Sequence, residues 1–324
     1  MVAKMKLTVA GSPHIRSANR TSRIMLDVII ALIPALIASC YFFGIRSLFV
    51  TATCVAFAVA AEYVTRKIMK RDNTVGDLSA VVTGILLAYN LPVSIPLWMA
   101  AVGSVFAIVV VKQFFGGIGQ NVANPTITAR IILMLSFSGQ MTHWVMPFYY
   151  LSSAGTDAVA SATPLAAASS GGAVPSLFEL FIGERAGCLG ETSVLALLIG
   201  FAYLLIRRVI NPVVPLVYIG TVFAFSFFAG ADPVYQIMSG GLMLGAIFMA
   251  TDYSTSPVTN SGKAIFALGC GLITSLIRFY GSYPEGVSFS ILFMNLLVPY
   301  IDKFTRTRPF GVDKNAKKKR GAKV

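Results

Sequence analysis

The stretch "DLSAVVTGILLAYNLP", residues 77–92, is strongly apolar but too short to cross a lipid bilayer as a plain helix. A membrane-spanning helix needs about 17–25 residues, and Pro92 stops this one early. A second stretch of the same kind, "SGGLMLGAIFMATD" at 239–252, is short and interrupted by glycines. Matching interrupted segments in two halves of a chain are typical of an internal repeat whose broken helices surround a central site.

Composition places the whole chain in a membrane. Of its 324 residues, 56% are hydrophobic and 12% charged, and its mean hydropathy is +0.76. Soluble domains carry about 25% charged residues. We therefore predict one membrane domain over 1–324, all-α, with about ten transmembrane helices. The apolar segments lie near 24–43, 47–65, 77–91, 95–112, 126–148, 190–206, 212–230, 236–251, 263–280 and 286–302.

These segments divide into two groups of five, and the short segment is the third of each group. The fourth segments also end alike, in "QFFGG" (113–117) and "RFYGS" (278–282). Because five is odd, the second copy would be inverted relative to the first, which predicts a five-plus-five inverted repeat with two broken helices. Chance similarity of glycine-rich apolar segments is the alternative.

The net charge of +13 reflects topology rather than binding to nucleic acid. All but three of the 26 Lys and Arg residues fall on every second turn, and such turns face the cytoplasm. Residues 1–23 and the basic tail 303–324 are then both cytoplasmic, and the tail is expected to contact anionic lipid headgroups. The connection 149–189 lies outside. The three exceptions are Arg46, Arg185 and Arg278.

No motif for a metal or a nucleotide is present. The four cysteines form no Cys-x-x-Cys pair, and the two histidines are far apart. "GIGQNV" follows an apolar helix rather than a strand, and "NSGKA" has no upstream glycine for a phosphate loop. "LIASC", ending at Cys40, loosely resembles a lipoprotein cleavage site, but the repeat needs the segment that cleavage would remove.

Acidic residues near membrane segments suggest function by default. Asp77 opens the broken third segment and is a candidate for an ion path, although capping of a helix N-terminus explains it equally well. Glu62 lies four residues before Arg66, and Asp27 four residues after Arg23. That spacing predicts two surface ion pairs.

The stretch "DAVASATPLAAASSGG", residues 157–172, is small and pliable in the middle of an apolar chain. Its threonine, Thr163, is flanked by small residues and followed by a Ser- and Gly-rich segment that supplies slack. A tolerated solvent-exposed loop is the simplest interpretation of this composition.

Several stretches together resemble a known family over nearly the whole chain. They are "SRIML" (22–26), "DLSAVVTGILLAYNLP", "KQFFGGIGQNVANP" (112–125), "SATPL" (161–165), "MLGAIFMATD" (243–252) and "IRFYGSYPEGVSF" (277–289). In this order they resemble the D subunits of Rnf electron-transport complexes. The B subunit of the sodium-pumping NADH:quinone oxidoreductase is similar, but it normally carries a longer N-terminal extension, so the resemblance favours Rnf.

The resemblance implies a covalent flavin on the outer side. In the family, the threonine of the Ala-Thr-Pro-Leu motif, here Ala162 to Leu165 with Pro164 between, carries FMN through a phosphoester installed by a flavin transferase. Thr163 is the matching residue, and Asp157 matches an acid of the transferase signature. Ala160 stands where Ser or Thr is usual and Ser161 where glycine is common, which weakens the local match. We expect an accessible Thr163 hydroxyl.

The resemblance also implies a second, non-covalent flavin, riboflavin or FMN, toward the cytoplasm. Asn121, Asn124 and Asp252 are the candidates for its contacts, because amides and a carboxylate suit the edge of a flavin ring. Helix capping is the alternative, since Asn124-Pro125 is a good helix start and Asp252 suits a turn.

The implied function is electron relay in a bacterial cytoplasmic membrane, coupling ferredoxin and NAD chemistry to Na⁺ or H⁺ translocation. The implied partners are the A, B, C, E and G subunits and the flavin transferase. The chain itself would contribute no catalytic side chain and no metal site. From the residues alone, a passive transporter or channel is the rival, because inverted repeats with broken helices also build solute pores.

Overall fold

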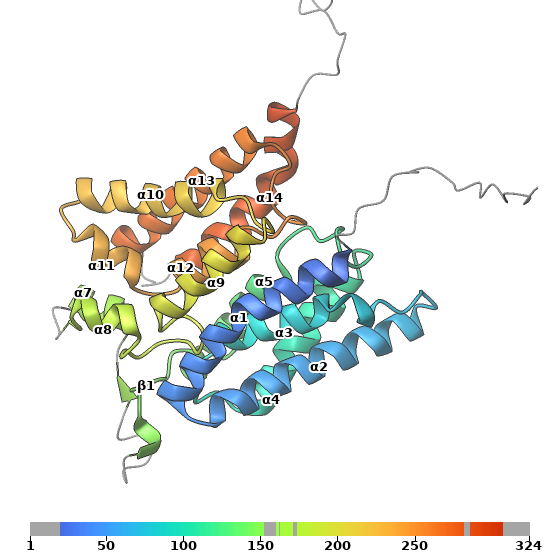
Figure 1. Cartoon of the computed structure of the whole chain (residues 1–324), viewed down its shortest axis with the longest axis horizontal. Coiled ribbons are helices and arrows are strands. Elements are labelled where there is room, and N and C mark those ends of the chain that lie inside the picture. The colour runs from blue at the N-terminus through green and yellow to red at the C-terminus, as the bar shows by residue number, and fades with distance from the viewer. Residues whose placement is uncertain (1–19, 152–159, 162, 171–173, 282–285, 307–324) are drawn as a thin grey trace, which may run out of the picture.

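The computed structural model describes residues 20–151, 160–161, 163–170, 174–281 and 286–306, and this part of the chain is mostly helical (Figure 1). The prediction of an all-α membrane protein is confirmed. Within the described residues, four helices are long and apolar enough to cross a membrane. They are α1 (Thr21–Phe43), α2 (Arg46–Ile68), α13 (Asn260–Tyr280) and α14 (Val287–Thr305).

Five of the six remaining predicted segments are helical but shorter. They are α3 (Ser79–Tyr89), α4 (Leu97–Phe106) continuing into the π-helix η2 (Ala107–Gln113), α5 (Pro125–Ser136), α9 (Val194–Ile206) and α10 (Val213–Phe228). The segment predicted over 126–148 was too long, because α5 ends at Ser136 and α6 (Ser138–Met141) and β1 (Trp144–Val145) follow. The number of membrane crossings stays a prediction.

Both third segments are broken helices, as their sequences indicate. In the first half, a 3₁₀ turn η1 (Val75–Asp77) precedes α3, and residues 90–96, which include Pro92 and Pro96, form no helix. In the second half, the segment is divided into α11 (Pro233–Met238), α12 (Leu242–Leu244) and the π-helix η5 (Gly245–Met249). Proline without an N–H, and glycine without a side chain, weaken helices at these places.

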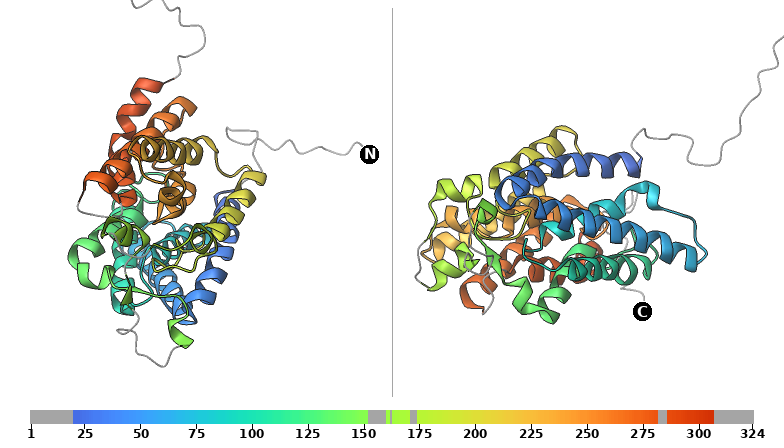
Figure 2. Two further views of the ribbon diagram at one scale, coloured as in Figure 1. Left: turned by 90° about the vertical axis from the view of Figure 1, so that its left-hand side faces the viewer. Right: turned by 90° about the horizontal axis from the view of Figure 1, so that it is seen from below.

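The two halves pack as a repeat would require. The first helices of the halves, α1 and α9, contact each other, and so do the fifth helices, α5 and α14. Within the halves, α2 packs on α3 and α4, while α10 packs on α11 and α13. Figures 1 and 2 show the blue-to-green helices and the orange-to-red helices as two bundles lying side by side.

The connection between the halves lies at one end of the molecule, which we call the loop end (Figure 1). It carries the 3₁₀ turn η3 (Tyr149–Leu151), β2 (Ala160–Ser161), α7 (Pro164–Ser170) and α8 (Leu177–Ile182). β1 and β2 pair antiparallel, with Trp144 opposite Ser161. The Ser176 capping box begins α8, since Ser176 Oγ accepts from the Glu179 N–H and the Glu179 carboxylate accepts from the Ser176 N–H.

The three arginines outside the basic turns donate hydrogen bonds to backbone carbonyls near interruptions of the helices. Each donates to carbonyl groups that no helix satisfies, and a buried carbonyl without a partner is costly, above all in a membrane. This explains why positive charges stand on the predicted outer side. Arg46 Nε donates to the Val93 carbonyl (2.8 Å), Arg185 Nη1 to that of Met238 (2.7 Å) and Arg278 Nη1 to that of Gln236 (2.6 Å).

Two of the basic residues counted with the cytoplasmic turns are instead buried. Lys112 is 2% exposed and Arg130 is 5% exposed. Arg130 Nη1 donates to Asn90 Oδ1 (2.7 Å) at the end of the broken helix α3. Sequence position placed both residues near turns, but packing turns their side chains inward.

The two predicted surface ion pairs were wrong. Glu62 is fully buried, and its partner is Lys112, whose Nζ lies 3.0 Å from Glu62 Oε2. Asp27 pairs with Arg207 (Nη2 to Oδ2 3.2 Å) and accepts from Tyr203 Oη (3.0 Å). Both carboxylates face neighbouring segments of the chain. Each therefore pairs with a basic residue of another segment and not with the one four positions away on its own helix.

Candidate functional site

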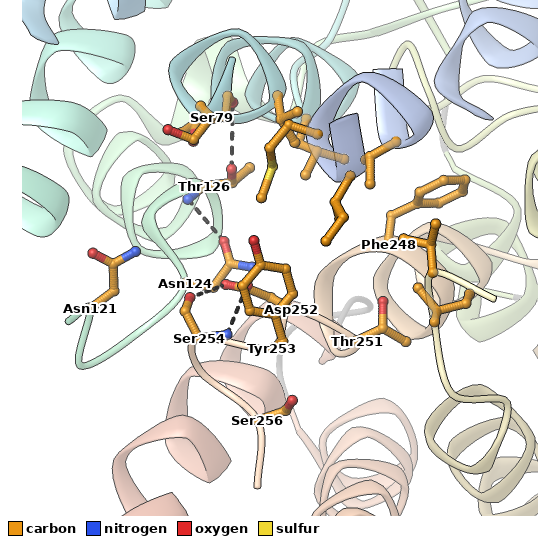
Figure 3. Close-up of a pocket in the computed structure, with 18 of the residues that line it drawn as sticks. Ser79, Asn121, Asn124, Thr126, Phe248, Thr251, Asp252, Tyr253, Ser254 and Ser256 are labelled. Carbon is orange, nitrogen blue, oxygen red and sulfur yellow. Dashed lines mark hydrogen bonds between the residues drawn. The ribbon is translucent and has the colours of Figure 1, made fainter. Parts of the chain in front are cut away.

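A pocket lies between residues of α3 and η5, which belong to the two broken helices, and Figure 3 shows residues that line it. Its cavity volume is about 160 Å³. The helices α1, α3 and α9 and the π-helix η5 contribute apolar walls through residues such as Met25, Val82, Leu86, Leu204 and Phe248. Asn211 and Lys263, from two turns predicted to be cytoplasmic, also line it.

All three residues predicted to hold a second flavin line this one pocket. Two of them, Asn121 and Asn124, belong to one segment, and Asp252 follows more than a hundred residues later. The fold brings the two segments together. Figure 3 shows Asn124 and Asp252 grouped with Tyr253 and Ser254, while Asn121 lies to one side. The structure therefore supports their assignment to a common site, whatever its ligand.

Asn124 is also a helix cap, as the alternative interpretation held. Its Oδ1 accepts from Thr126 N (3.0 Å) and Ile127 N (3.4 Å), and Pro125 occupies the first position of α5. Its Nδ2 donates to the Met249 carbonyl at the end of η5 (3.2 Å). The side chain thus fixes the start of α5 and joins it to the other half.

Asp252 orders the segment after η5. Its carboxylate accepts from Ser254 N (3.1 Å), Ser254 Oγ (2.8 Å) and Thr255 Oγ1 (3.2 Å). Burial raises the pKa of this carboxyl above its ordinary value, against the hydrogen bonds, which lower it. The turn that the sequence suggested is present, and the carboxyl also faces the pocket.

Asn121 has a different character. Its Oδ1 is buried and has no hydrogen-bond partner among the described residues, although it lines the pocket. A buried acceptor without a partner costs free energy unless a ligand or water satisfies it. The N–H of a flavin ring is such a donor, so Asn121 suits the edge of a flavin, whereas the cavity of about 160 Å³ is smaller than ligand sites of about 300–1,000 Å³ and would have to widen to take the ring.

Sequence reasoning missed the charged group in the wall of this pocket. Lys112 lines it, and its Nζ donates to both oxygens of Glu62 and to Ser79 Oγ. Glu62 accepts further bonds from Thr74 Oγ1 (2.7 Å) and Gln113 Nε2 (3.0 Å). The feature of the sequence that could have predicted this group is the position of Lys112 within a predicted apolar segment.

Asp77, the sequence candidate for an ion path, acts as a cap in this structure. Its Oδ1 accepts from Ser79 N (2.8 Å) and from Ser79 Oγ at the start of α3. Ser79 in turn accepts from Lys112, so Asp77 is joined to the pocket wall through one side chain. These contacts explain Asp77 as a cap, and its place on an ion path stays a prediction.

The Thr163 site lies at the loop end, far along the chain from the pocket. Thr163 is 3% exposed, and its Oγ1 accepts from Ala166 N (3.3 Å) at the start of α7. The expectation of an accessible hydroxyl is therefore not met. The Pro164 carbonyl accepts from Tyr235 Oη (3.0 Å), Leu165 is 6% exposed, and Ser161 lies in β2. Asp157 and Ala162 lie outside the described residues.

Comparison with known proteins gives matches along almost the entire chain. The model of the NQR2, RnfD, RnfE family matches residues 8–311. The chain is 50% identical over 316 residues to the D subunit of the Na(+)-translocating ferredoxin:NAD(+) oxidoreductase complex of Acetobacterium woodii, covering 96% of this chain and 97% of that protein. It is 43% identical over 327 residues to the D subunit of the proton-translocating ferredoxin:NAD(+) oxidoreductase complex of Clostridium ljungdahlii (96% and 98%). It is 38% identical over 328 residues to the D subunit of the ion-translocating oxidoreductase complex of Stutzerimonas stutzeri (90% and 93%).

Proposed function

This chain belongs to the NQR2, RnfD, RnfE family, and on that premise we propose that it is the D subunit of an ion-translocating ferredoxin:NAD(+) oxidoreductase complex. The observation that carries the proposal is the match, along nearly the full length of both chains and at 50% identity, to a protein of that name. The role is electron transfer within a membrane complex. A passive solute pore, which the repeat alone allowed, is not favoured by these relatives.

The family model is named for NQR2 and RnfE as well as RnfD, whereas the three relatives are all D subunits, two of them of ferredoxin:NAD(+) oxidoreductase complexes. We therefore assign the A, B, C, E and G subunits of an Rnf complex as partners, and a bacterial cytoplasmic membrane as the location. Affinity purification of the tagged chain from its native membrane should recover those subunits. Recovery of quinone oxidoreductase subunits instead would overturn the assignment.

The covalent cofactor in this proposal is FMN, held by a phosphoester at Thr163 Oγ1. The phosphate tail anchors the flavin while its ring keeps its redox chemistry, which the protein then tunes. Because Thr163 is 3% exposed and its hydroxyl accepts from Ala166 N, a flavin transferase must act while this segment is open. Flavinylation would then precede the final packing of α7.

In-gel fluorescence tests this attachment. The chain, produced together with its flavin transferase, should give a fluorescent band that survives SDS, and Thr163→Ala should abolish it. Thr142→Ala, a change at an exposed threonine of the same end, should leave the band unchanged. A dark wild-type band, or a bright Thr163→Ala band, would refute the attachment.

The pocket between the broken helices is proposed to hold a second flavin without a covalent link. Asn121 Oδ1 would accept a hydrogen bond from the ring, and Lys112, whose charge is paired with Glu62, would stand at the pocket wall. A carrier in this position answers a physical need. An electron on the outer FMN must recross about 30 Å of hydrocarbon to reach a cytoplasmic acceptor.

Flavin stoichiometry tests the pocket. Denatured wild-type protein should release free flavin in addition to the covalent equivalent. Asn121→Ala should weaken riboflavin binding up to about tenfold, because a hydrogen bond contributes about 0.5–1.5 kcal/mol and 1.4 kcal/mol is tenfold. Asn73→Ala, at an exposed asparagine outside the pocket, is the matched control. Absence of releasable flavin from gently purified wild type would remove this part of the proposal.

A further inference from the structure

An apolar groove runs along the first half of the protein, between α2 and the continuous helix formed by α4 and η2. Its cavity volume is about 370 Å³, and every residue that lines it is apolar. Phe57 of α2 forms one wall, and residues between Ala101 and Val110 form the other. Phe57, Val102 and Val105 are 46%, 50% and 38% exposed, so the groove is open on the side away from the core.

The groove has the length of one leaflet of a lipid bilayer. A helix rises about 1.5 Å per residue, so the wall from Ala101 to Val110 is about 14 Å long. The hydrocarbon core of a bilayer is about 30 Å thick, which gives each leaflet about 15 Å. Phe57 stands at the middle of α2, a helix long and apolar enough to cross the membrane. The groove is therefore placed to receive a hydrocarbon chain that reaches the middle of the bilayer.

An apolar stripe on α2 leads from the groove to a basic side chain. Phe57, Val64 and Ile68 recur on one face of the helix, and all three are exposed. Arg71 follows them, and its Nη1 lies 3.5 Å from the carbonyl oxygen of Gln113, three residues beyond the last residue of the groove. One end of the groove is therefore next to a guanidinium group, on the side predicted to be cytoplasmic.

Arg66 lies at the same end and has a hydrogen-bond donor to spare. A Cβ at Gly117 would lie 2.5 Å from its Nη2, so this side chain packs on the turn that follows η2. Its Nε is buried and has no hydrogen-bond partner within the ranges that the structure describes. A buried donor without a partner costs free energy unless a ligand or water accepts from it. A phosphate oxygen is a strong acceptor for a guanidinium.

The surroundings of these arginines are basic as a whole. Lys67 and Lys70 are exposed beside them, and Asp72 is the one acidic residue of the sequence 66–72. The nearby carboxylate of Glu62 is already paired with Lys112. An anionic group at this end of the groove would therefore meet an excess of positive charge.

We infer that this groove binds one anionic phospholipid, with an acyl chain between α2 and the α4–η2 helix and its phosphate at Arg66 and Arg71. The two parts of such a lipid match the two parts of the site, an apolar groove of leaflet length and a basic end. The inference does not rest on either flavin proposal, because the groove shares no lining residue with the pocket between the broken helices and lies apart from Thr163.

A helix of a partner subunit fits this groove less well than a lipid chain. Interfaces between membrane helices are rich in Gly, Ala, Ser and Thr, which allow close approach of two backbones. The exposed walls here are phenylalanine and valine. A helix with its side chains is also about 10–12 Å across, whereas a cavity of about 370 Å³ and about 14 Å in length is narrower than that.

Lipid titration tests the basic end. The full chain is purified in a neutral detergent, and native mass spectrometry counts bound phosphatidylglycerol or phosphatidylcholine with the same acyl chains. Wild type should bind one phosphatidylglycerol in preference to phosphatidylcholine. Lys67→Gln combined with Arg71→Gln should weaken this binding up to about thirtyfold, because each basic residue near an anionic lipid contributes about 1 kcal/mol and 1.4 kcal/mol is tenfold.

The matched control removes the same charge elsewhere. Arg208→Gln combined with Lys303→Gln changes two exposed basic residues of other turns predicted to be cytoplasmic. This variant should bind phosphatidylglycerol as wild type does. Equal binding of the two lipids by wild type, or equal weakening in the two double variants, would overturn the inference.

Filling the groove tests the place of the acyl chain. Val102→Phe and Val105→Phe enlarge exposed residues that line it, whereas Leu272→Phe enlarges an exposed residue of α13 that does not. The two filling variants should bind phosphatidylglycerol several-fold more weakly, and Leu272→Phe should bind it as wild type does. Thermal midpoints measured without lipid check that each variant is folded.

Two results would assign the site to another ligand and overturn the inference. If glycerol phosphate, which has no acyl chains, displaced phosphatidylglycerol as effectively as the lipid itself, the site would be an anion site without a role for the groove. If both filling variants kept their lipid but lost a subunit from the purified complex, the groove would be a contact with a protein partner.

Discussion

Glu62 and Lys112, fifty residues apart in sequence, form a buried ion pair in which Nζ lies 3.0 Å from Oε2. The side chains are 0% and 2% exposed. The pair joins α2 to the π-helix η2 and borders the pocket between the broken helices. π-Helical turns are rare and occur often at functional sites, where they redirect a side chain. Here η2 carries the lysine that reaches the pocket wall.

Removing one charge of this pair should destabilise the protein more than removing both charges. Glu62→Met or Lys112→Met alone leaves one charge buried without its partner, which costs about 3–5 kcal/mol. The double variant should be markedly more stable than either single variant in thermal unfolding of the detergent-solubilised protein. Arg207→Gln, at a pair whose arginine is 40% exposed, should lower the midpoint far less than either single variant. Equal losses in single and double variants would contradict the pairing.

The contact between the halves depends on Gly200. A Cβ there would lie 2.2 Å from the Ala31 carbonyl oxygen of α1. Small residues allow such close approach of membrane helices. Gly200→Ala should therefore destabilise the protein by about 1–3 kcal/mol through overpacking.

Gly220 in α10 provides the matched comparison, because nothing lies within 4 Å of its Cβ position. Gly220→Ala should be neutral or stabilise by up to about 1 kcal/mol through helix propensity. The two variants are ranked by the midpoint of thermal unfolding in one detergent. Gly200→Ala unfolding at or above the temperature of Gly220→Ala would show that α1 and α9 do not approach as described.

Arg185 should prove to be a structural residue rather than a topology signal. It is 2% exposed and donates to the carbonyls of Thr192 (3.1 Å) and Met238 (2.7 Å). Hydrogen bonds from a charged donor contribute about 1.5–3 kcal/mol each. Arg185→Gln should lower the thermal midpoint while both chain ends keep their side in protease-protection assays. Unchanged stability would refute the role.

The distribution of basic residues predicts topology, and reporter fusions check it. Fusions at Ala154 and Asn211 should report opposite sides, outside and inside respectively. Both reporters on one side would place the Thr163 site in the wrong compartment for an outer flavin transferase. The measurement is independent of flavin content, so it tests the fold alone.

Local patterns in the sequence predicted the elements correctly where the cause is local. Pro92 and the glycines of 239–252 interrupt both third segments because a missing N–H or a missing side chain acts on its own turn. Asn124 caps α5 because its amide oxygen reaches the N–H groups of its own helix start. The grouping of Asn121, Asn124 and Asp252 came from the family resemblance, and the structure places all three in one pocket.

Tertiary structure alone decided the partners of the charges and the burial of Thr163. Spacing along one helix pointed to Arg66 for Glu62, but the buried carboxylate pairs with a lysine that is buried with it, whereas Arg66 is only partly buried. Which lysine that is depends on how α2 and η2 pack. Likewise, a pliable composition suggested an open loop around Thr163, whereas the hydrogen bond from Tyr235 to the Pro164 carbonyl joins the start of α7 to α11. The sequence shows which charged and polar side chains need partners, and packing between distant segments determines which partners they contact.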